Sequence, residues 1–252
     1  MSENFSKLNA KHYLHRLRHR FIKWTCQYNI AGDISDLENF CDKDVLFENE
    51  RAHIQRFLSP NRINESLNGI SMIKKLVGNM CASSPTQIQL LWDSSGAPKV
   101  LCHNSKTGEK HIPVSISHST GMVTGICMNP VDSDVRYRPQ IGIDIEKISS
   151  EIPTSIIEMF SEQEQAYISM LPDWQKSLVF TKLWTRKEAL FKSSNFAFGD
   201  IISWNAIPNQ IISGNTFEFF QLDTLYLAEI DIVTSIAIRR NKQVLSQKFE
   251  NH

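Results

Sequence analysis

The sequence has no excess charge of either sign: its 252 residues include 27 Lys plus Arg and 27 Asp plus Glu, and its pI is about 7.1. The absence of net positive charge argues against a general nucleic-acid binder, which needs a basic face to contact phosphate. The absence of net negative charge argues against an acidic, disordered tail. Apolar residues make up 41% of the chain, which is ordinary for a globular protein, and the length suits one large domain or two small ones.

Paired cysteines, a long apolar run and a leader segment are also missing. No two of the five cysteines are spaced as Cys-x-x-Cys, which argues against a zinc ribbon and a redox dithiol. No run approaches the roughly 20 apolar residues that cross a bilayer, and no apolar stretch typical of a secretory signal follows Met1. We therefore expect a reduced, soluble, cytoplasmic protein that binds no membrane.

The N-terminal segment departs from the overall charge balance. Its first 32 residues include six basic residues and one acidic residue. Leu14, Leu17, Phe21 and Trp24 recur at steps of three and four, which predicts an amphipathic helix. Three interpretations stay open: a docked surface helix with a solvated basic face, a contact surface for an acidic partner, and an organelle transit peptide.

Hydrophobic periodicity predicts helices mixed with strands. The expected helices are Glu50–Phe57, Arg62–Met80, Ser161–Ser169 and Ser177–Lys192. The expected strands are Ile88–Trp92, Val114–Ser117, Met122–Met128, Ile141–Ile145, Phe217–Phe220, Leu225–Ile232 and Ser235–Arg239. Val100–Ile112 is predicted to be loop-like with a hairpin tip at Lys106-Thr107-Gly108, and Pro130–Arg138 is predicted as a linker. This order indicates an α+β fold rather than strict βαβ alternation, and its two halves share a loose pattern of helix followed by strands.

The stretch Ile141–Glu146 places two carboxylates on one face of a strand. Side chains alternate across a strand, so three isoleucines face one way, while Asp144 and Glu146 face the other. Two like charges this close repel each other unless a cation lies between them, and Mg²⁺ accepts such oxygen ligands. Gly142 lets another chain or a ligand approach closely. A half-exposed edge strand with solvated polar residues is an equally open interpretation.

The helix expected at Ser177–Lys192 carries a second pair of charges. Glu188 and Lys192 are four residues apart and therefore share a face. They can form a surface ion pair worth about 0.3–0.5 kcal/mol. Alternatively, Glu188 completes a metal site and the Lys192 ammonium holds a phosphate.

A third stretch, Pro113–Ser119, ends a predicted strand with hydroxyls and an imidazole. Ser117 and His118 are suitable donors to a phosphate at this position. A turn stabilised by serine side chains explains the same residues without a ligand.

Together these stretches resemble the Sfp-type 4′-phosphopantetheinyl transferases. The hallmarks of that family are a Ser-His pair ending a strand, a G-[IV]-D-x-E strand and a W-[ST]-x-K-E-[AS]-x-x-K helix. This sequence has Ser117-His118, Gly142–Glu146 and Trp184–Lys192 in that order. The resemblance covers roughly residues 50–237, and the first 49 residues match nothing in it.

The resemblance implies an α+β fold with two similar α+β halves related by a pseudo-twofold axis and an active site at their junction. We expect the halves to divide near Pro139, into residues 1–139 and 140–252. The N-terminal half would take the 3′-phosphate and adenine of coenzyme A. The C-terminal half would take the metal and the pyrophosphate. We expect the chain to be a monomer.

The resemblance also assigns a metal site and a catalytic set. Asp144, Glu146 and Glu188 match the family's ligands for Mg²⁺, with Mn²⁺ as the alternative ion. Lys192 matches a lysine that contacts the pyrophosphate of coenzyme A. Glu164, the last acid of an F-S-x-x-E pattern, is a candidate proton relay. The expected catalytic residues are therefore Glu188, Lys192 and Glu164.

Further residues are implied in binding coenzyme A itself, the co-substrate. They are Arg51, Ser66, Gly96, Ser117, His118, Lys187 and Lys192. The sequence departs from the family at Gly96–Lys99, where many members have Gly-Lys-Pro: the lysine is missing or displaced by two positions. A basic pair of some members is replaced here by Glu50 and His53. Arg51 or Arg56 is the expected substitute, and Arg51 is included among the binding residues. Both departures affect residues that the resemblance assigns to binding the 3′-phosphate of coenzyme A.

The implied activity is transfer of the phosphopantetheine arm of coenzyme A to a serine of an acyl- or peptidyl-carrier protein, with release of 3′,5′-ADP. The carrier is left open among those of fatty acid, polyketide and nonribosomal peptide assembly. One alternative is a non-catalytic carrier- or nucleotide-binding module of the same fold. Another is an unrelated Mg²⁺-dependent phosphoryl-transfer enzyme or nuclease, which the lack of a broad basic groove disfavours.

Overall fold

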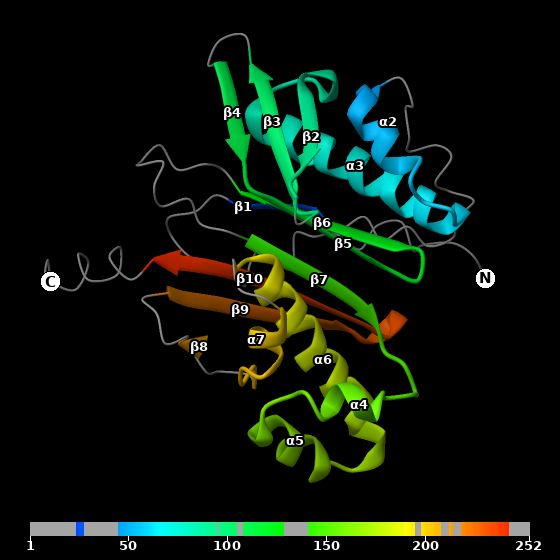
Figure 1. Cartoon of the computed structure of the whole chain (residues 1–252), viewed down its shortest axis with the longest axis vertical. Coiled ribbons are helices and arrows are strands. Elements are labelled where there is room, and N and C mark those ends of the chain that lie inside the picture. Colours follow the sequence, from blue (N-terminus) through cyan, green and yellow to red (C-terminus); the bar gives the residue numbers. More distant parts are fainter. Residues whose placement is uncertain are drawn as a thin grey trace, which may run out of the picture. The chain divides into compact units, whose positions relative to one another are not determined.

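The computed structural model describes residues 24–27, 45–94, 96–104, 108–128, 141–194, 198–207, 212–213 and 218–241. The chain divides into two compact units, Met1–Asp134 and Val135–His252 (Figure 1). This division and the boundary expected near Pro139 both fall within 129–140, outside the described residues. The basic segment of the first 23 residues and the linker Pro130–Arg138 also lie outside them.

A long helix forms the core of the N-terminal unit. Helix α3 (Pro60–Cys81) starts with Pro60 at its first position and ends where Ala82 takes a left-handed conformation with a φ of 50°. Its buried residues Ile70, Ile73 and Leu76 recur at helical spacing. The shorter helix α2 (Glu48–Ile54) precedes it, and the single turn η4 (Pro85–Gln87) follows.

Two antiparallel sheets complete this unit. One has the strand order β1–β6–β5, with β1 (Trp24–Gln27), β6 (Met122–Met128) and β5 (Val114–Ser119). The other has the order β2–β3–β4, with β2 (Ile88–Trp92), β3 (Pro98–Asn104) and β4 (Gly108–Ile112). A Cβ added at Gly69 of α3 would lie 3.1 Å from Ile116 Cγ2, so α3 packs directly on β5.

Two expectations from the sequence are wrong in this unit. Val100–Ile112 is not loop-like, because its two sides pair as the antiparallel strands β3 and β4. This pairing agrees with the expected hairpin, whose tip residues Lys106 and Thr107 lie outside the described residues. Val100, Cys102 and Ile112 are all buried, but polar residues between them mask the period of two. Trp24 does not continue a helix, since the backbone of Trp24–Gln27 pairs with β6.

A buried ion pair ties α2 to α3. Lys74 Nζ lies 2.7 Å from Glu50 Oε2, and both side chains are buried. Glu50 also accepts hydrogen bonds from the backbone N–H groups of Phe47 and Leu90, at 2.9 and 2.8 Å. Lys74 donates to Val45 O and lies 4.5 Å from the centre of the Phe47 ring. Every charge of this pair is therefore compensated, as burial requires.

The C-terminal unit packs helices on one antiparallel sheet. The strand order is β7–β10–β9–β8, with β7 (Ile141–Lys147), β10 (Ile232–Asn241), β9 (Glu218–Leu227) and β8 (Ile212–Ser213). The helices are α4 (Thr154–Ile157), α5 (Glu162–Ser169), α6 (Asp173–Lys192) and α7 (Phe198–Ile202), and the turn η6 (Ala228–Ile230) joins β9 to β10. Helix α6 lies against β7 and β10 and buries Leu183 and Leu190.

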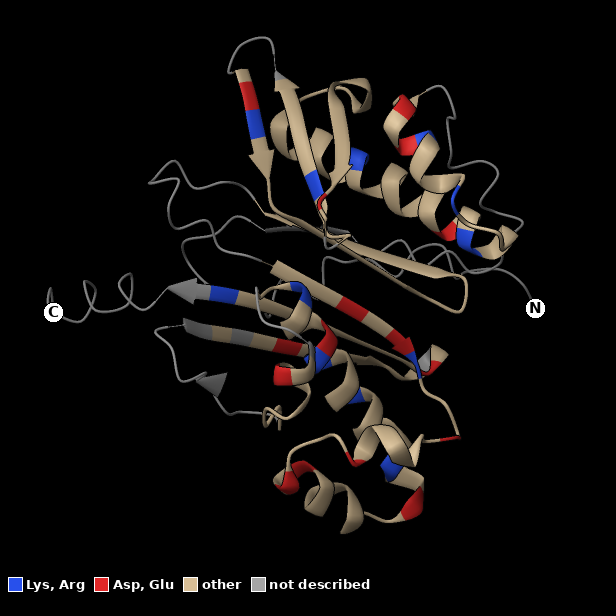
Figure 2. Cartoon of the chain, viewed as in Figure 1, with Lys and Arg blue, Asp and Glu red and all other residues tan. Residues whose placement is uncertain are grey.

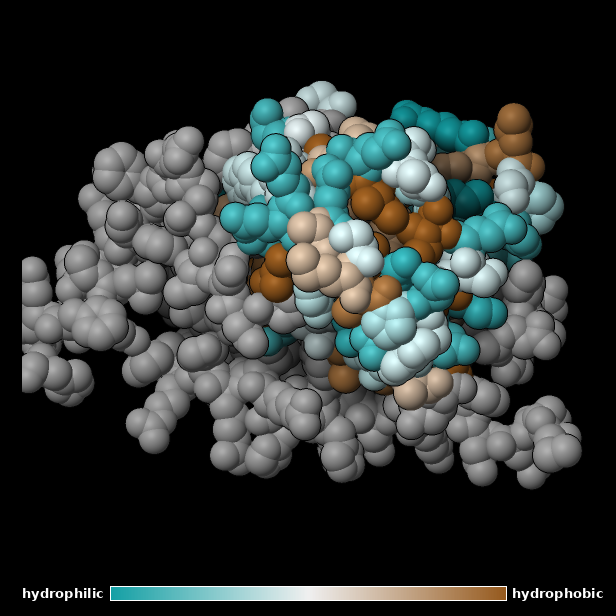
Figure 3. Space-filling model, turned by 90° about the horizontal axis from the view of Figure 1, so that it is seen from below, coloured by the Kyte–Doolittle hydropathy of each residue, from teal (hydrophilic) through white to brown (hydrophobic). Residues whose placement is uncertain are grey.

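The fold class expected from the sequence is confirmed at the level of mixed helices and antiparallel strands. The pseudo-twofold relation between the halves stays a prediction. Along the described helices and strands, basic and acidic residues are interspersed (Figure 2). On the face that Figure 3 shows, apolar residues form separate patches among hydrophilic ones. None of the described helices is long and apolar enough to cross a bilayer.

Candidate active site

Strand β7 holds its two carboxylates toward helix α6. A Cβ added at Gly142 would lie 2.0 Å from Ala189 O, so the Gly142 face of the strand meets the helix backbone. Asp144 and Glu146 share that face by the alternation of the strand. Asp144 is buried, which excludes the alternative of a solvated polar face for this residue, although β7 is an edge strand.

Lys192, at the end of α6, forms an ion pair with Asp144. Its Nζ lies 2.6 Å from Asp144 Oδ1, and the two side chains are 26% and 5% exposed. Thr234 of the neighbouring strand donates to the backbone oxygen of Asp144 over 2.8 Å, which fixes β7 at this point. The alternative without a metal site was a simple ion pair between Lys192 and Glu188 on the helix surface. The contact of Lys192 with Asp144 shows that this alternative is incomplete.

Glu188 belongs to the same charged group. Burial raises the pKa of its carboxyl group above the ordinary value, and the negative charges of Asp144 and Glu146 raise this pKa further. The Lys192 ammonium acts in the opposite direction. Four charged side chains from β7 and α6 thus act on one another, although the pair on β7 and the pair on α6 are more than 40 residues apart in sequence.

The donor set of this group fits a hard cation. Three carboxylates are oxygen ligands of the kind that Mg²⁺ and Mn²⁺ prefer, and their mutual repulsion raises the pKa of Glu188. Within the described ranges, no three His, Cys, Asp or Glu side chains lie close enough together to form a preformed metal-binding site. Lys192 neutralises Asp144 in this arrangement.

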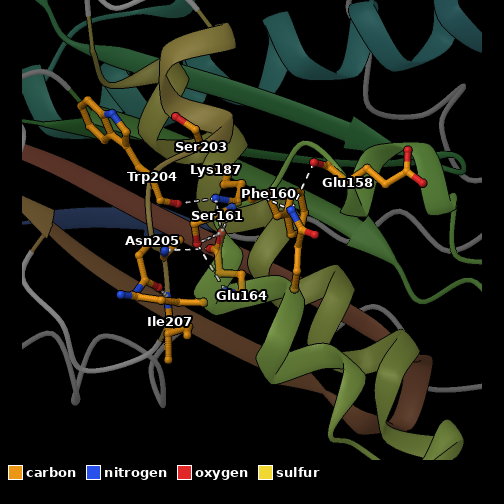
Figure 4. Close-up of polar contacts among 12 residues, drawn as sticks. Glu158, Phe160, Ser161, Glu164, Lys187, Ser203, Trp204, Asn205 and Ile207 are labelled. Carbon is orange, nitrogen blue, oxygen red and sulfur yellow. Dashed lines mark hydrogen bonds and ion pairs between the residues drawn. The ribbon is translucent and has the colours of Figure 1, made fainter.

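Glu164 and Lys187 form a second buried ion pair (Figure 4). Lys187 Nζ lies 2.8 Å from Glu164 Oε2, and neither side chain is exposed to solvent. Glu164 also accepts hydrogen bonds from Ser161 N, Ser161 Oγ and Ala206 N, at 3.0, 2.8 and 2.8 Å. Lys187 donates to Trp204 O. The structure therefore brings together two residues that the sequence placed at a proton relay and at a phosphate.

In the N-terminal unit, His118 lies beside an arginine that the sequence did not single out. Arg62 Nη1 lies 2.7 Å from His118 Nδ1 and 3.3 Å from Glu65 Oε2. Glu65 is buried, and its other oxygen accepts from Gly121 N over 3.1 Å. The Arg62 guanidinium also lies 5.7 Å from the centre of the Phe57 ring. The i, i+3 spacing of Arg62 and Glu65 was a signal for this pair, but its contact with His118 joins residues 56 apart.

The strand alternation of β5 separates the Ser-His pair. Ile116 and His118 lie on the face toward α3, as the contact of Gly69 with Ile116 indicates, so Ser117 points to the opposite face and is buried. Ser66 lies on α3 one turn after Arg62.

Two other predicted contacts with coenzyme A lie elsewhere in this unit. Arg51 is exposed on α2. Gly96 lies in the turn between β2 and β3 with a φ of 82°, a conformation that favours glycine, and Lys99 just after it pairs with Asp93 over 3.5 Å.

Comparison with known proteins connects the carboxylate strand and α6 to one family. Residues 140–245 match the model of the 4′-phosphopantetheinyl transferase superfamily. The chain is also 27% identical over 152 residues to the 4′-phosphopantetheinyl transferase HetI of Nostoc sp.. This similarity covers 60% of the chain and 60% of the Nostoc protein. The C-terminal unit, which carries Asp144, Glu146, Glu188 and Lys192, is therefore similar in sequence to phosphopantetheinyl transferases.

Proposed function

We propose that the protein transfers the 4′-phosphopantetheine arm of coenzyme A to a serine of an acyl- or peptidyl-carrier protein and releases 3′,5′-ADP. The observation that carries this proposal is the group of Asp144, Glu146, Glu188 and Lys192, which acts as one electrostatic unit. The match to the phosphopantetheinyl transferase superfamily, over residues 140–245, covers the same residues. Three carboxylates and a lysine suit a substrate that brings a diphosphate together with its cation.

In this proposal Asp144, Glu146 and Glu188 hold Mg²⁺, with Mn²⁺ as a substitute. The bound ion would neutralise charge on the phosphoryl oxygens of coenzyme A. Lys192 is partly exposed, so its ammonium reaches a phosphate oxygen and stabilises the charge that develops on the departing 3′,5′-ADP. This task takes Lys192 away from Asp144.

A proton must leave the carrier serine as its oxygen bonds to the β-phosphorus and the bond to the leaving 3′,5′-ADP breaks. Glu188 suits the role of general base, because burial raises the pKa of its carboxyl group above the ordinary value. Glu164, the other candidate, is fully buried with its carboxylate oxygens engaged by four donors. In this proposal, Glu188 therefore accepts the proton of the carrier serine.

The direct test supplies purified protein with coenzyme A that carries a fluorescent group on its thiol, a carrier protein and Mg²⁺. Labelling of the carrier, which EDTA abolishes and excess Mg²⁺ restores, is the expected result. Binding of coenzyme A by calorimetry without labelling of any carrier class would instead support a non-catalytic module. Cleavage of coenzyme A without transfer would favour a different phosphoryl-transfer reaction.

Substitution of Arg62 by Ala is expected to raise the KM for coenzyme A about tenfold, the effect of losing one charge-assisted hydrogen bond. Arg62 is half-exposed and contacts His118 and Glu65 through Nη1, so its other N–H groups can meet a phosphate. The KM for 3′-dephospho-coenzyme A should not change, because that substrate lacks the phosphate. Lys75→Ala, an exposed position on the same helix, is the control. Equal effects on both substrates would contradict this role.

Deletion of residues 1–21 is expected to raise the KM for the carrier protein about tenfold and to leave the KM for coenzyme A unchanged. The segment holds most of the excess positive charge of the N-terminus, and the resemblance implies an acidic carrier, which such charge attracts. The deletion stops before Trp24 because strand β1 pairs with β6. The difference between the two proteins should disappear in 0.5 M salt; a difference that persists would argue against a charged docking segment.

A further inference from the structure

The Glu164–Lys187 pair joins three separate segments of the C-terminal unit. Glu164 lies in the first turn of α5, Lys187 lies on α6, and the backbone groups of Trp204 and Ala206 follow α7. Figure 4 shows the Lys187 side chain directed at Glu164 from the helix above it. The Lys187 ammonium also lies 4.8 Å from the centre of the Phe160 ring. We call this arrangement the buried clamp.

The clamp is inaccessible to a substrate. Both side chains have no exposed surface, and the carboxylate and the ammonium compensate each other. Burial lowers the pKa of Lys187, and the charge of Glu164 opposes this shift. A direct contact with coenzyme A would have to open the pair and leave one charge buried alone, which is strongly unfavourable.

The position of Lys187 on α6 relates the clamp to the candidate active site. Successive residues of an α-helix are rotated by about 100°. Taking Lys187 as the origin, Glu188 lies at about 100°, Lys192 at about 140° and Ala189 at about 200° around the helix axis. The two functional side chains therefore lie between the clamp on one side and Ala189 on the other.

Ala189 marks the face of α6 that touches the sheet. Its carbonyl oxygen lies against Gly142, and Thr185 Oγ1 lies 2.8 Å from Ser235 Oγ on β10. The helix is thus held on its sheet side by β7 and β10, and on its outer side by the clamp. Contacts on both sides prevent α6 from rolling about its axis.

We propose that the Glu164–Lys187 clamp is a positioning device that sets the rotation of α6, so that Glu188 and Lys192 face Asp144 and Glu146 of β7. The pair acts through the helix and does not touch the substrate. This inference rests on the proposed function for its consequence in the reaction. The rotation of the helix and the affinity of the carboxylates for a cation can be measured without that reaction.

The chain contains its own matched control. Glu50 and Lys74 form an equally buried pair in the N-terminal unit, with the same kinds of backbone partners and a phenylalanine ring. The elements that carry Glu50 and Lys74 bear none of the proposed metal ligands. A variant of either pair loses a buried ion pair, but only the clamp variant should alter the metal site.

The experiment compares the full-length double variants Glu164→Gln/Lys187→Met and Glu50→Gln/Lys74→Met with the wild type. Replacing both partners by neutral residues of similar size avoids an isolated buried charge. Mn²⁺ alone is titrated and its free fraction measured by electron paramagnetic resonance, and thermal unfolding is followed by circular dichroism. The apparent Kd for Mn²⁺ is expected to rise about tenfold in the clamp variant, as for other supports of metal ligands, and to stay unchanged in the control. The kcat of transfer should fall by a similar factor.

Milder variants cover the case in which a double variant does not fold. Glu164→Asp keeps both charges and shortens the acidic side chain by one methylene group. Glu50→Asp is its control. A weaker rise in the Kd for Mn²⁺ with Glu164→Asp alone supports positioning. Folded clamp variants that bind Mn²⁺ as tightly as the wild type would overturn the positioning role. An equal loss of Mn²⁺ affinity in the clamp variants and in the Glu50–Lys74 variants would overturn it as well. A wild type that binds Mn²⁺ but labels no carrier would refute the proposed function and leave the comparison of affinities decisive for the clamp.

Discussion

Substitution of Glu188 by Gln is expected to lower the rate of phosphopantetheine transfer about 10³-fold while the protein keeps or slightly raises its melting temperature. The loss follows because Glu188 would both complete the carboxylate group and receive the serine proton, and such contributions amount to several kcal/mol. The stability follows from the opposite effect of the same charge. Burial and the acids Asp144 and Glu146 raise the pKa of Glu188, so its ionised form is unfavourable in the folded state.

The measurement pairs kcat/KM for both substrates with thermal unfolding near neutral pH. Glu162→Gln, an identical change at an exposed position of α5, is the control and should alter neither quantity. At a pH below the ordinary pKa of glutamate, where Glu188 is protonated in the unfolded state as well, any stability gain of Glu188→Gln should disappear. A variant that loses stability together with activity would show that Glu188 serves the fold rather than the reaction. Retained transfer in a stable variant would refute its catalytic role.

Substitution of Gly142 by Ala is expected to destabilise the protein by about 3 kcal/mol and to lower its melting temperature by roughly 10 °C. The added Cβ would stand 2.0 Å from Ala189 O and 2.8 Å from Ser193 N. Both are backbone atoms of the α6 C-terminus, so no side chain can rotate away. Strand and helix must instead separate, which carries Glu188 and Lys192 away from Asp144. Transfer should therefore fall beyond the loss of folded protein.

Gly199→Ala provides the matched control, because a Cβ at Gly199 of α7 meets nothing within 4 Å. That change should be neutral or slightly stabilising, as expected for alanine in a helix. Denaturation in urea, analysed for both variants at the same protein concentration, gives the free energies of unfolding. An unfolding free energy of Gly142→Ala equal to that of the wild type would mean that α6 and β7 can shift apart without cost.

The parts of the site that follow local periodicity were predictable from the sequence. The alternation of β7 placed Asp144 and Glu146 on one face of a strand that the structure contains. The burial of Asp144 was not predicted. The four-residue step placed Glu188 and Lys192 on one face of a helix that the structure contains. In both cases the relevant neighbours lie within one turn or two strand residues, where backbone geometry alone fixes the side chains.

The contacts that the sequence did not reveal join distant segments. Glu164 and Lys187 were assigned separate tasks, because nothing in a linear pattern indicates that a helix start and a helix middle share an ion pair. Arg62 was overlooked for the same reason, since its contact with His118 depends on how α3 lies on β5. Close approach at Gly142 was expected, but the approaching group, the backbone of α6, is decided by tertiary packing.

The two buried ion pairs share more than their chemistry. In each unit a glutamate in the first turn of a short helix binds a lysine of the longest helix, while a phenylalanine that precedes the glutamate by three or four residues lies under the ammonium. Each glutamate also receives backbone N–H groups at its own helix start and from a later segment. Recurrence of one detailed arrangement in both halves is what duplication of a half-length ancestral chain would leave behind. If the halves arose in this way, the proposed metal ligands Asp144, Glu146 and Glu188 would be what one copy acquired, or the other lost, after the halves began to diverge.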